Sequence, residues 1–144
     1  MKKILIDCDP GHDDMIAIMV ALAAKDVEVL GITTVAGNQT GDKTYVNARK
    51  VLTMIGRQDV PLAKGAMVPL VRELITAAFI HGESGLEGVE LPEPDGPVLD
   101  VSARDFIVET LRNADGKVIL VPTGPLTNIA TIIRSAPEVL DKIE

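Results

Sequence analysis

The chain has 144 residues, enough for one domain with a real hydrophobic core, and 47% of them are hydrophobic. Its net charge of −7 and 2% aromatic content argue against nucleic-acid binding, which uses cationic side chains for the phosphates and aromatic rings for stacking. Cys8 is the single cysteine, so no internal disulfide can form, and no apolar run is long enough for a signal peptide or a membrane span. We therefore expect a soluble, cytoplasmic protein that binds neither nucleic acid nor membranes.

The predicted elements alternate between strand and helix along the chain. Short apolar, β-branched runs predict strands, and longer stretches with helical spacing predict helices. In chain order they are strand 3–7, helix 14–24, strand 27–35, helix 41–56, a short strand 61–65, helix 102–114 with Ser102 as N-cap, strand 117–121, and helix 123–134 with Pro125 in its first turn. Segment 81–97 is rich in Gly, Glu and Pro and is predicted to be a long loop.

Two helices carry expectations about burial. Helix 14–24 is apolar on nearly every side, because Ile16 and Val20 add to its helical stripe, and this predicts a buried helix. Helix 41–56 has mixed charge and is expected to be half exposed, with an apolar side formed by Val46, Val51, Leu52 and Ile55.

Alternating strands and helices predict an α/β fold: one domain, residues 1–144, with a parallel sheet and helices on both faces. In such folds ligands bind at the carboxyl ends of the strands. The chemically distinctive residues collect at that edge: Asp7, Asp9, Asp13 and Asp14 after the first strand, Thr33, Thr34 and Asn38 after the second, Lys64 after the third, and Thr123, Gly124 and Asn128 after the fourth.

The acidic turn DCDPGHDD (7–14) places four aspartates in eight positions. Carboxylates held close together repel, and one stays protonated unless a cation neutralises them. All-oxygen ligands favour Ca²⁺ or Mg²⁺ over zinc, and the turn at Thr123 could add a backbone carbonyl. An aspartate at a helix N-terminus also caps the helix or favours its dipole, but this accounts for one or two aspartates rather than four.

Three nearby features have open interpretations. The segment HGESGLEG (81–88) is either a lid whose His81 reaches a substrate or a solvated glycine-rich loop. His12 either orients one of the acids or has no direct role. Cys8 is predicted to be inert, since neighbouring carboxylates raise the pKa of a thiol.

The motif D-x-D-P-G-x-D-D directly after the first strand, followed in order by TTVAGN (33–38), HGESGLEG and VPTGPLTN (121–128), resembles the nucleoside hydrolases, the inosine–uridine-preferring N-ribohydrolase family. The resemblance implies a Rossmann-like nucleoside hydrolase fold. It also implies a Ca²⁺-dependent enzyme that cleaves the N-glycosidic bond of a small-molecule ribonucleoside to give ribose and a free base.

The resemblance further implies roles for individual residues. Asp9 and Asp14 would bind calcium together with the backbone carbonyl of Thr123, and Asp9 would also be the base that activates a calcium-bound water. Asp13 and Asn38 would bind the ribose, His81 would contact the nucleoside, and Asp7 would support the cluster from behind.

Members of this family continue well beyond residue 144, so the chain resembles their N-terminal half, with a sheet that is incomplete at its C-terminal side. We expect the isolated chain to bind calcium weakly, to turn over nucleosides poorly or not at all, and to form homo-oligomers through uncovered apolar surface. Two alternatives remain: a non-catalytic α/β half-domain that keeps the acidic motif, and a phosphatase with an aspartyl nucleophile. The residues Pro-Gly-His after Asp9 argue against the phosphatase.

Overall fold

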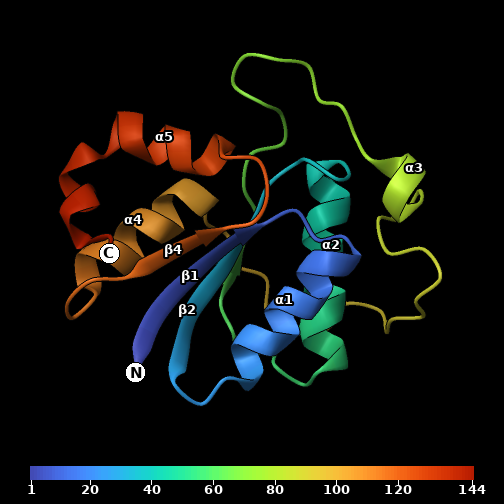
Figure 1. Ribbon diagram of the computed structural model, residues 1–144, viewed down its shortest axis with the longest axis horizontal. Helices are drawn as coiled ribbons and strands as arrows, with labels where there is room; N and C mark the ends of the chain where they lie inside the picture. The colour runs from blue at the N-terminus through green and yellow to red at the C-terminus, as the bar shows by residue number, and fades with distance from the viewer.

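The computed structural model describes residues 1–144 and contains one sheet of four parallel strands (Figure 1). The strands are β1 (Lys2–Cys8), β2 (Val27–Thr34), β3 (Leu62–Ala63) and β4 (Ile119–Pro122), in the spatial order β3-β2-β1-β4. This confirms the predicted α/β fold with a parallel sheet.

The register of the sheet makes its strands end level with one another. Asp7 lies opposite Thr33 of β2 and Pro122 of β4, and Thr33 lies opposite Ala63 of β3. The loops that leave the four strands therefore start side by side at the carboxyl edge.

Helices cover both faces of the sheet (Figure 1). On one face lie α1 (His12–Ala23) and α2 (Gly41–Met54), and on the other lie α4 (Ala103–Asn113), α5 (Thr127–Ser135) and a 3₁₀ helix (Pro137–Lys142). The remaining helix, α3 (Ala78–His81), is a single turn in the loop region beyond α2. None of the helices is both long and apolar enough to span a bilayer.

The alternation of side chains along β1 produces two hydrophobic cores. Ile4, Ile6 and Cys8 pack with α1 and α2, whereas Leu5 packs with α4 and α5. The thiol of Cys8 is fully buried, and this burial, followed by the charges of the nearby aspartates, raises its pKa well above the usual value. Cys8 is therefore a core residue, consistent with the prediction that it is inert.

The prediction that α1 is buried on all sides is wrong. Only Asp14 and Ile18 of this helix are buried, while Ile16 is 52% and Val20 63% exposed. Helices that cover a sheet form the outer layer, so one stripe faces the strands and the opposite side has no neighbour. The same geometry leaves Val46 of α2 on the outside, contrary to its predicted place on the apolar side.

Several predicted boundaries also shift. The third strand has two residues instead of five, and the last helix begins at Thr127 rather than residue 123. Pro125 explains the second difference, because a proline disfavours helical geometry in the preceding residue, here Gly124. The predicted loop 81–97 contains no strand and only the last residue of α3, a helix that was not predicted.

Exposed apolar side chains gather between β3 and the end of α3, where Val71, Ile75 and Phe79 are 94%, 86% and 86% exposed. Surface of this kind favours association. Homo-oligomer formation stays a prediction.

Candidate functional site

The carboxyl edge brings three loops into contact: the acidic turn after β1, the turn after β2, and the turn after β4. Asn38 joins the first two, because its backbone N–H donates to Asp9 Oδ2 at 2.6 Å and its side-chain Nδ2 donates to the Asp9 carbonyl at 3.1 Å. The backbone N–H of Thr123 donates to the Asp7 carbonyl at 2.9 Å and attaches the third loop. Of the residues predicted at this edge, Asp7, Asp9, Asn38 and Thr123 are therefore joined in one cluster.

Asp9 and Asp14 form the centre of the cluster. Asp14 Oδ2 accepts a hydrogen bond from the backbone N–H of Asp9 at 2.9 Å, so the two carboxyl groups are held on one turn of the chain. Both residues are buried, with 6% and 2% of their surface exposed.

Burial raises the pKa values of both side chains, and a negatively charged neighbour raises each pKa further. For Asp9, desolvation and then the charge of Asp14 outweigh the hydrogen bond from Asn38 and raise the pKa to about 7. The pKa of Asp14 is raised mainly by desolvation, with a further contribution from the charge of Asp13. Without a bound cation, the carboxyl group of Asp9 therefore still carries a proton part of the time near neutral pH.

Two glycines allow the backbone of the neighbouring loops to lie close against the carboxylate of Asp9. A Cβ atom on Gly37 would lie 2.2 Å from Asp9 Oδ2, and one on Gly124 would lie 2.7 Å from Asp9 Oδ1. Both distances are too short for a side chain, so each carboxylate oxygen of Asp9 needs a glycine beside it.

These donors fit a hard cation that completes its ligand shell from the backbone and from water. Residues 1–144 contain no group of three or more His, Cys, Asp or Glu side chains placed to share an ion. Two buried carboxylates with adjacent backbone are compatible with calcium, which accepts carbonyl and water oxygens alongside carboxylates.

Asp7 lies beneath this pair and links three elements. Its Oδ1 accepts hydrogen bonds from Thr33 Oγ1 at 2.6 Å and Asn128 Nδ2 at 2.8 Å, while its Oδ2 is buried without a partner. Burial raises the pKa of Asp7 although these two hydrogen bonds act in the opposite direction.

The other predicted site residues differ in exposure. Asp13 lies in the first turn of α1, next to Asp14, and is exposed. Asn38 is half-buried, and Thr123 is exposed in the loop after β4. All three lie at the same edge as Asp9.

His81, the last residue of α3, lies over the acidic turn. Its ring stacks on that of His12, with 3.2 Å between the two Nδ1 atoms, and it fills the space next to Gly11, where a Cβ would come within 2.7 Å of the ring. The other ring nitrogen of His12 is 3.0 Å from the Glu87 carbonyl. His12 is therefore bonded to the 81–88 segment and to none of the acids.

Segment 81–88 is anchored to the body of the protein at several points, while Glu83, Ser84, Glu87 and Gly88 are exposed. Gln39 Nε2 donates to the Gly82 carbonyl at 3.0 Å, and Asn47 Nδ2 donates to the carbonyls of Ser84 at 2.9 Å and Pro10 at 3.1 Å. Leu86 is 4% exposed and belongs to the core beside α1 and α2. These contacts hold His81 near the acidic turn, and its role toward a substrate stays a prediction.

The sequence analysis did not single out Asn47 or Gln39, and it gave Asn128 no role. Asn47 and Asn128 are both buried, and Asn128 also donates to the Thr34 carbonyl and accepts from the Ala66 N–H. The sequence does contain an indication for Asn47, because this polar residue lies within the inward-facing stripe of α2. A buried amide without a hydrogen bond would destabilise the fold, so a partner is expected there.

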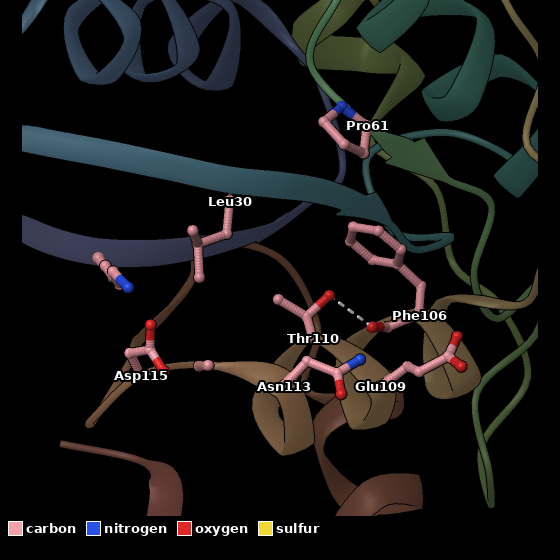
Figure 2. A pocket seen from close by; sticks show the side chains of 9 residues that line it. Leu30, Pro61, Phe106, Glu109, Thr110, Asn113 and Asp115 are labelled. Atoms are coloured by element: carbon pink, nitrogen blue, oxygen red, sulfur yellow. Dashed lines mark hydrogen bonds between the residues drawn. The ribbon is translucent and has the colours of Figure 1, made fainter.

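A cavity of about 430 Å³ adjoins the carboxyl edge. It is lined by Gly37 and Pro125 from the site loops and by segment 69–75, and its lining is mainly apolar. A second cavity of about 430 Å³ lies elsewhere. Figure 2 shows Leu30 of β2 facing α4, which carries Phe106, with Asp115 in the turn that follows this helix. No residue of the acidic turn lines that second cavity.

Several known proteins similar to this chain are named as nucleoside or ribonucleoside hydrolases. The chain is 50% identical over 143 residues to a pyrimidine-specific ribonucleoside hydrolase, RihA, of Shewanella sp. (strain MR-7), covering 99% of this chain and 45% of that protein. RihA of Salmonella arizonae is 51% identical over 140 residues. The chain thus spans a little under half the length of these relatives.

Solved structures agree on the fold. A purine-preferring ribonucleoside hydrolase from Gardnerella vaginalis superimposes with a TM-score of 0.91 at 36% identity, covering 99% of this chain and 46% of that one. A plant nucleoside hydrolase gives the same TM-score at 35% identity. The family model for inosine-uridine preferring nucleoside hydrolases matches residues 4–144, and the chain belongs to this family, corresponding to its N-terminal half.

Proposed function

We propose that this chain takes part in the calcium-dependent hydrolysis of the N-glycosidic bond of ribonucleosides, giving ribose and a free base. The observation that carries the proposal is the pair of buried carboxyl groups, Asp9 and Asp14, held on one turn at the carboxyl edge of the sheet. Two such carboxylates repel each other when both are ionised and no cation is bound. The hydrolysis of nucleosides, for which the family is named, is a reaction in which such a pair is useful.

Asp9, Asp14 and the backbone carbonyl of Thr123 would hold the calcium ion. Their oxygens suit a hard cation, and the glycines at positions 37 and 124 let the loops after β2 and β4 lie close to Asp9. When bound, the ion would neutralise the carboxylates and lower the pKa of a coordinated water.

Asp9 would be the general base. A cation bound beside Asp9 would keep its carboxylate ionised and therefore able to accept a proton from the coordinated water. The hydrogen bond from the Asn38 N–H fixes Asp9 Oδ2, and so orients the carboxyl group for proton transfer.

The sugar would be bound by Asp13 and Asn38. Asp13 is exposed and free to accept hydrogen bonds from ribose hydroxyls, and the surrounding carboxylates would stabilise the positive charge that develops on the sugar as the glycosidic bond breaks. His81 would contact the nucleoside from the anchored 81–88 segment, and Asp7 would hold the turn from below through Thr33 and Asn128.

We expect residues 1–144 alone to bind calcium weakly and to hydrolyse nucleosides slowly or not at all, because the relatives are about twice as long. The relatives' names include both a pyrimidine-specific and a purine-preferring enzyme, so the base has to be found with a panel of substrates. The family match gives no support to the phosphatase alternative.

A ribose-release assay with uridine and inosine, with calcium or with a chelator, tests the proposal. Any activity should require calcium and should disappear in Asp9→Asn. Activity that survives in chelator would contradict the proposal, whereas efficient turnover by the 144 residues alone would contradict only the expectation that the isolated chain is a poor enzyme. The non-catalytic alternative predicts that neither calcium nor ribose raises the melting temperature, whereas a ligand of the folded state must raise it.

A further inference from the structure

His12 and His81 face each other where segment 81–88 meets the acidic turn. Their Nδ1 atoms lie 3.2 Å apart, and both residues are half-buried. His12 is the first residue of α1 and His81 the last of α3, so the pair joins segments that are 69 positions apart in the sequence. Imidazole nitrogens are the ligands that zinc, copper and nickel prefer in proteins.

The hydrogen bonds of the pair determine where its protons lie. His12 Nε2 is 3.0 Å from the Glu87 carbonyl, which can only accept, so this nitrogen carries a proton. A neutral imidazole has one N–H, and His12 Nδ1 therefore has a free lone pair. One of the two facing Nδ1 atoms has to donate, so the proton between the rings belongs to His81 Nδ1. His12 thus presents an unprotonated nitrogen to the space between the rings.

The backbone of Glu87 gives His12 the surroundings of a metal ligand. A histidine that binds a metal through one ring nitrogen usually donates its other N–H to a carbonyl or a carboxylate, which fixes the ring and raises its basicity. Glu87 is itself held in place, because its backbone N–H donates to the His81 carbonyl at 3.1 Å. One residue of the segment is therefore bonded to both histidines.

The spacing of the two Nδ1 atoms suits a tetrahedral ion. Zinc–nitrogen bonds are about 2.0–2.1 Å long, and two such bonds at a tetrahedral angle separate their nitrogens by about 3.3–3.4 Å. The observed separation of 3.2 Å is close to this value. Rotation of the two rings about their Cβ–Cγ bonds would bring both lone pairs onto one ion, and water would complete its ligand shell.

We propose that His12 and His81 form a second cation site, which binds a nitrogen-preferring divalent transition metal such as Zn²⁺ and closes segment 81–88 on the acidic turn. Binding forms two metal–nitrogen bonds and breaks the hydrogen bond between the rings. The proton of His81 Nδ1 passes to solvent and His81 Nε2 takes one up, so both imidazoles stay neutral. The exposed carboxylates of Asp13 and Glu87, each on or beside a residue of the pair, favour a cation there.

This site differs in chemistry from the carboxyl pair of Asp9 and Asp14. Oxygen ligands favour calcium, whereas imidazole favours zinc, so the two ions need not compete. The inference therefore does not depend on the proposed function: a chain that fails to bind calcium would contradict that proposal and leave a zinc titration fully interpretable.

Zinc titration by isothermal calorimetry, on the tag-free chain at pH 7.5 with excess calcium, tests the proposal. We expect one zinc per chain. His12→Gln and His81→Gln should each weaken zinc binding by at least about tenfold, whereas Asp14→Asn should leave it nearly unchanged. Full affinity in either histidine variant would overturn the proposal, and loss of affinity in Asp14→Asn would overturn it in favour of an ion on the carboxylates.

Nitrogen-15 NMR of the imidazole rings gives a second measurement that needs no variant. His12 and His81 are the only histidines in the sequence, so every imidazole signal belongs to the pair. One equivalent of zinc should move the proton of His81 from Nδ1 to Nε2 and shift both Nδ1 signals together. Unchanged signals, or a shift at one ring alone, would contradict the proposal.

Limited proteolysis tests the closure of the segment. Zinc should slow cleavage within 81–88 in the parent chain but not in His12→Gln, because only the parent can link α1 to α3 through the ion. Equal cleavage rates with and without zinc in the parent chain would contradict the closure.

Discussion

Replacing Asp9 with asparagine should stabilise the metal-free chain by an amount that grows with pH. Burial, with the charge of Asp14, raises the pKa of Asp9 from its usual 3.8 to about 7. The folded chain therefore binds this proton more tightly than the unfolded chain does. The stability associated with protonated Asp9 is complete below about pH 4 and is lost progressively as the pH rises to about 7.

The size of the effect follows from the difference in pKa. One pKa unit corresponds to about 1.4 kcal/mol, so ionised Asp9 lowers the free energy of unfolding by up to about 4 kcal/mol at pH 8. Between pH 5 and pH 8 the loss is about 2–3 kcal/mol. Asparagine carries no charge and can still accept the hydrogen bond from the Asn38 N–H, so the variant avoids most of this loss.

Urea unfolding followed by circular dichroism, in chelator at pH 5, 6, 7 and 8, measures the difference between Asp9→Asn and the parent chain. The free energy of unfolding of Asp9→Asn, relative to that of the parent chain, should increase by about 2 kcal/mol or more over this range. Asp13→Asn is the matched control: it removes the same charge from an exposed position on the same turn and should give a small, nearly constant difference. A gain for Asp9→Asn that does not grow with pH would refute the conclusion that Asp9 carries an uncompensated buried charge.

Three further substitutions test the packing of the site. Gly124→Ala should weaken calcium binding by about tenfold or more in calorimetry, because its Cβ would lie 2.7 Å from Asp9 Oδ1; unchanged affinity would show that this glycine is not needed. Asn47→Ala should lower the free energy of unfolding by about 1–3 kcal/mol and speed proteolysis within 81–88, since two carbonyls lose their donor. The exposed Asn113→Ala should do neither. Asn128→Ala should lower the free energy of unfolding by about 2 kcal/mol or more, because it leaves Asp7 Oδ1 with one partner. Urea unfolding should show this as a lower midpoint, and an unchanged midpoint would contradict it.

The fold was predictable because local patterns determine it. All strands except the short β3 have a run with β-branched residues, and each long helix has a helical stripe. Their alternation allows few arrangements other than a covered parallel sheet. The common edge of Asp9, Asn38 and Thr123 then follows from topology, since the ends of parallel strands meet.

What could not be predicted depends on contacts between distant segments. Asn128 reaches Asp7 across 121 positions of sequence, and Asn47 reaches Pro10 across 37, so neither partner is visible in a local pattern. The exposure of Ile16 and Val20 has the same origin: apolar side chains on every side of α1 do not reveal which side has a neighbour. α5 begins at Thr127 rather than at residue 123, because Pro125 disfavours helical geometry at Gly124.

Calcium titration by isothermal calorimetry is the most direct test of the central claim that Asp9 and Asp14 share a divalent cation. The account predicts one calcium per chain at pH 8, binding lost in Asp14→Asn, and an affinity at pH 5 about 100-fold lower than above pH 7, because a proton then competes for Asp9. No calcium binding at pH 8, or the same affinity in the parent chain and in Asp14→Asn, would contradict it.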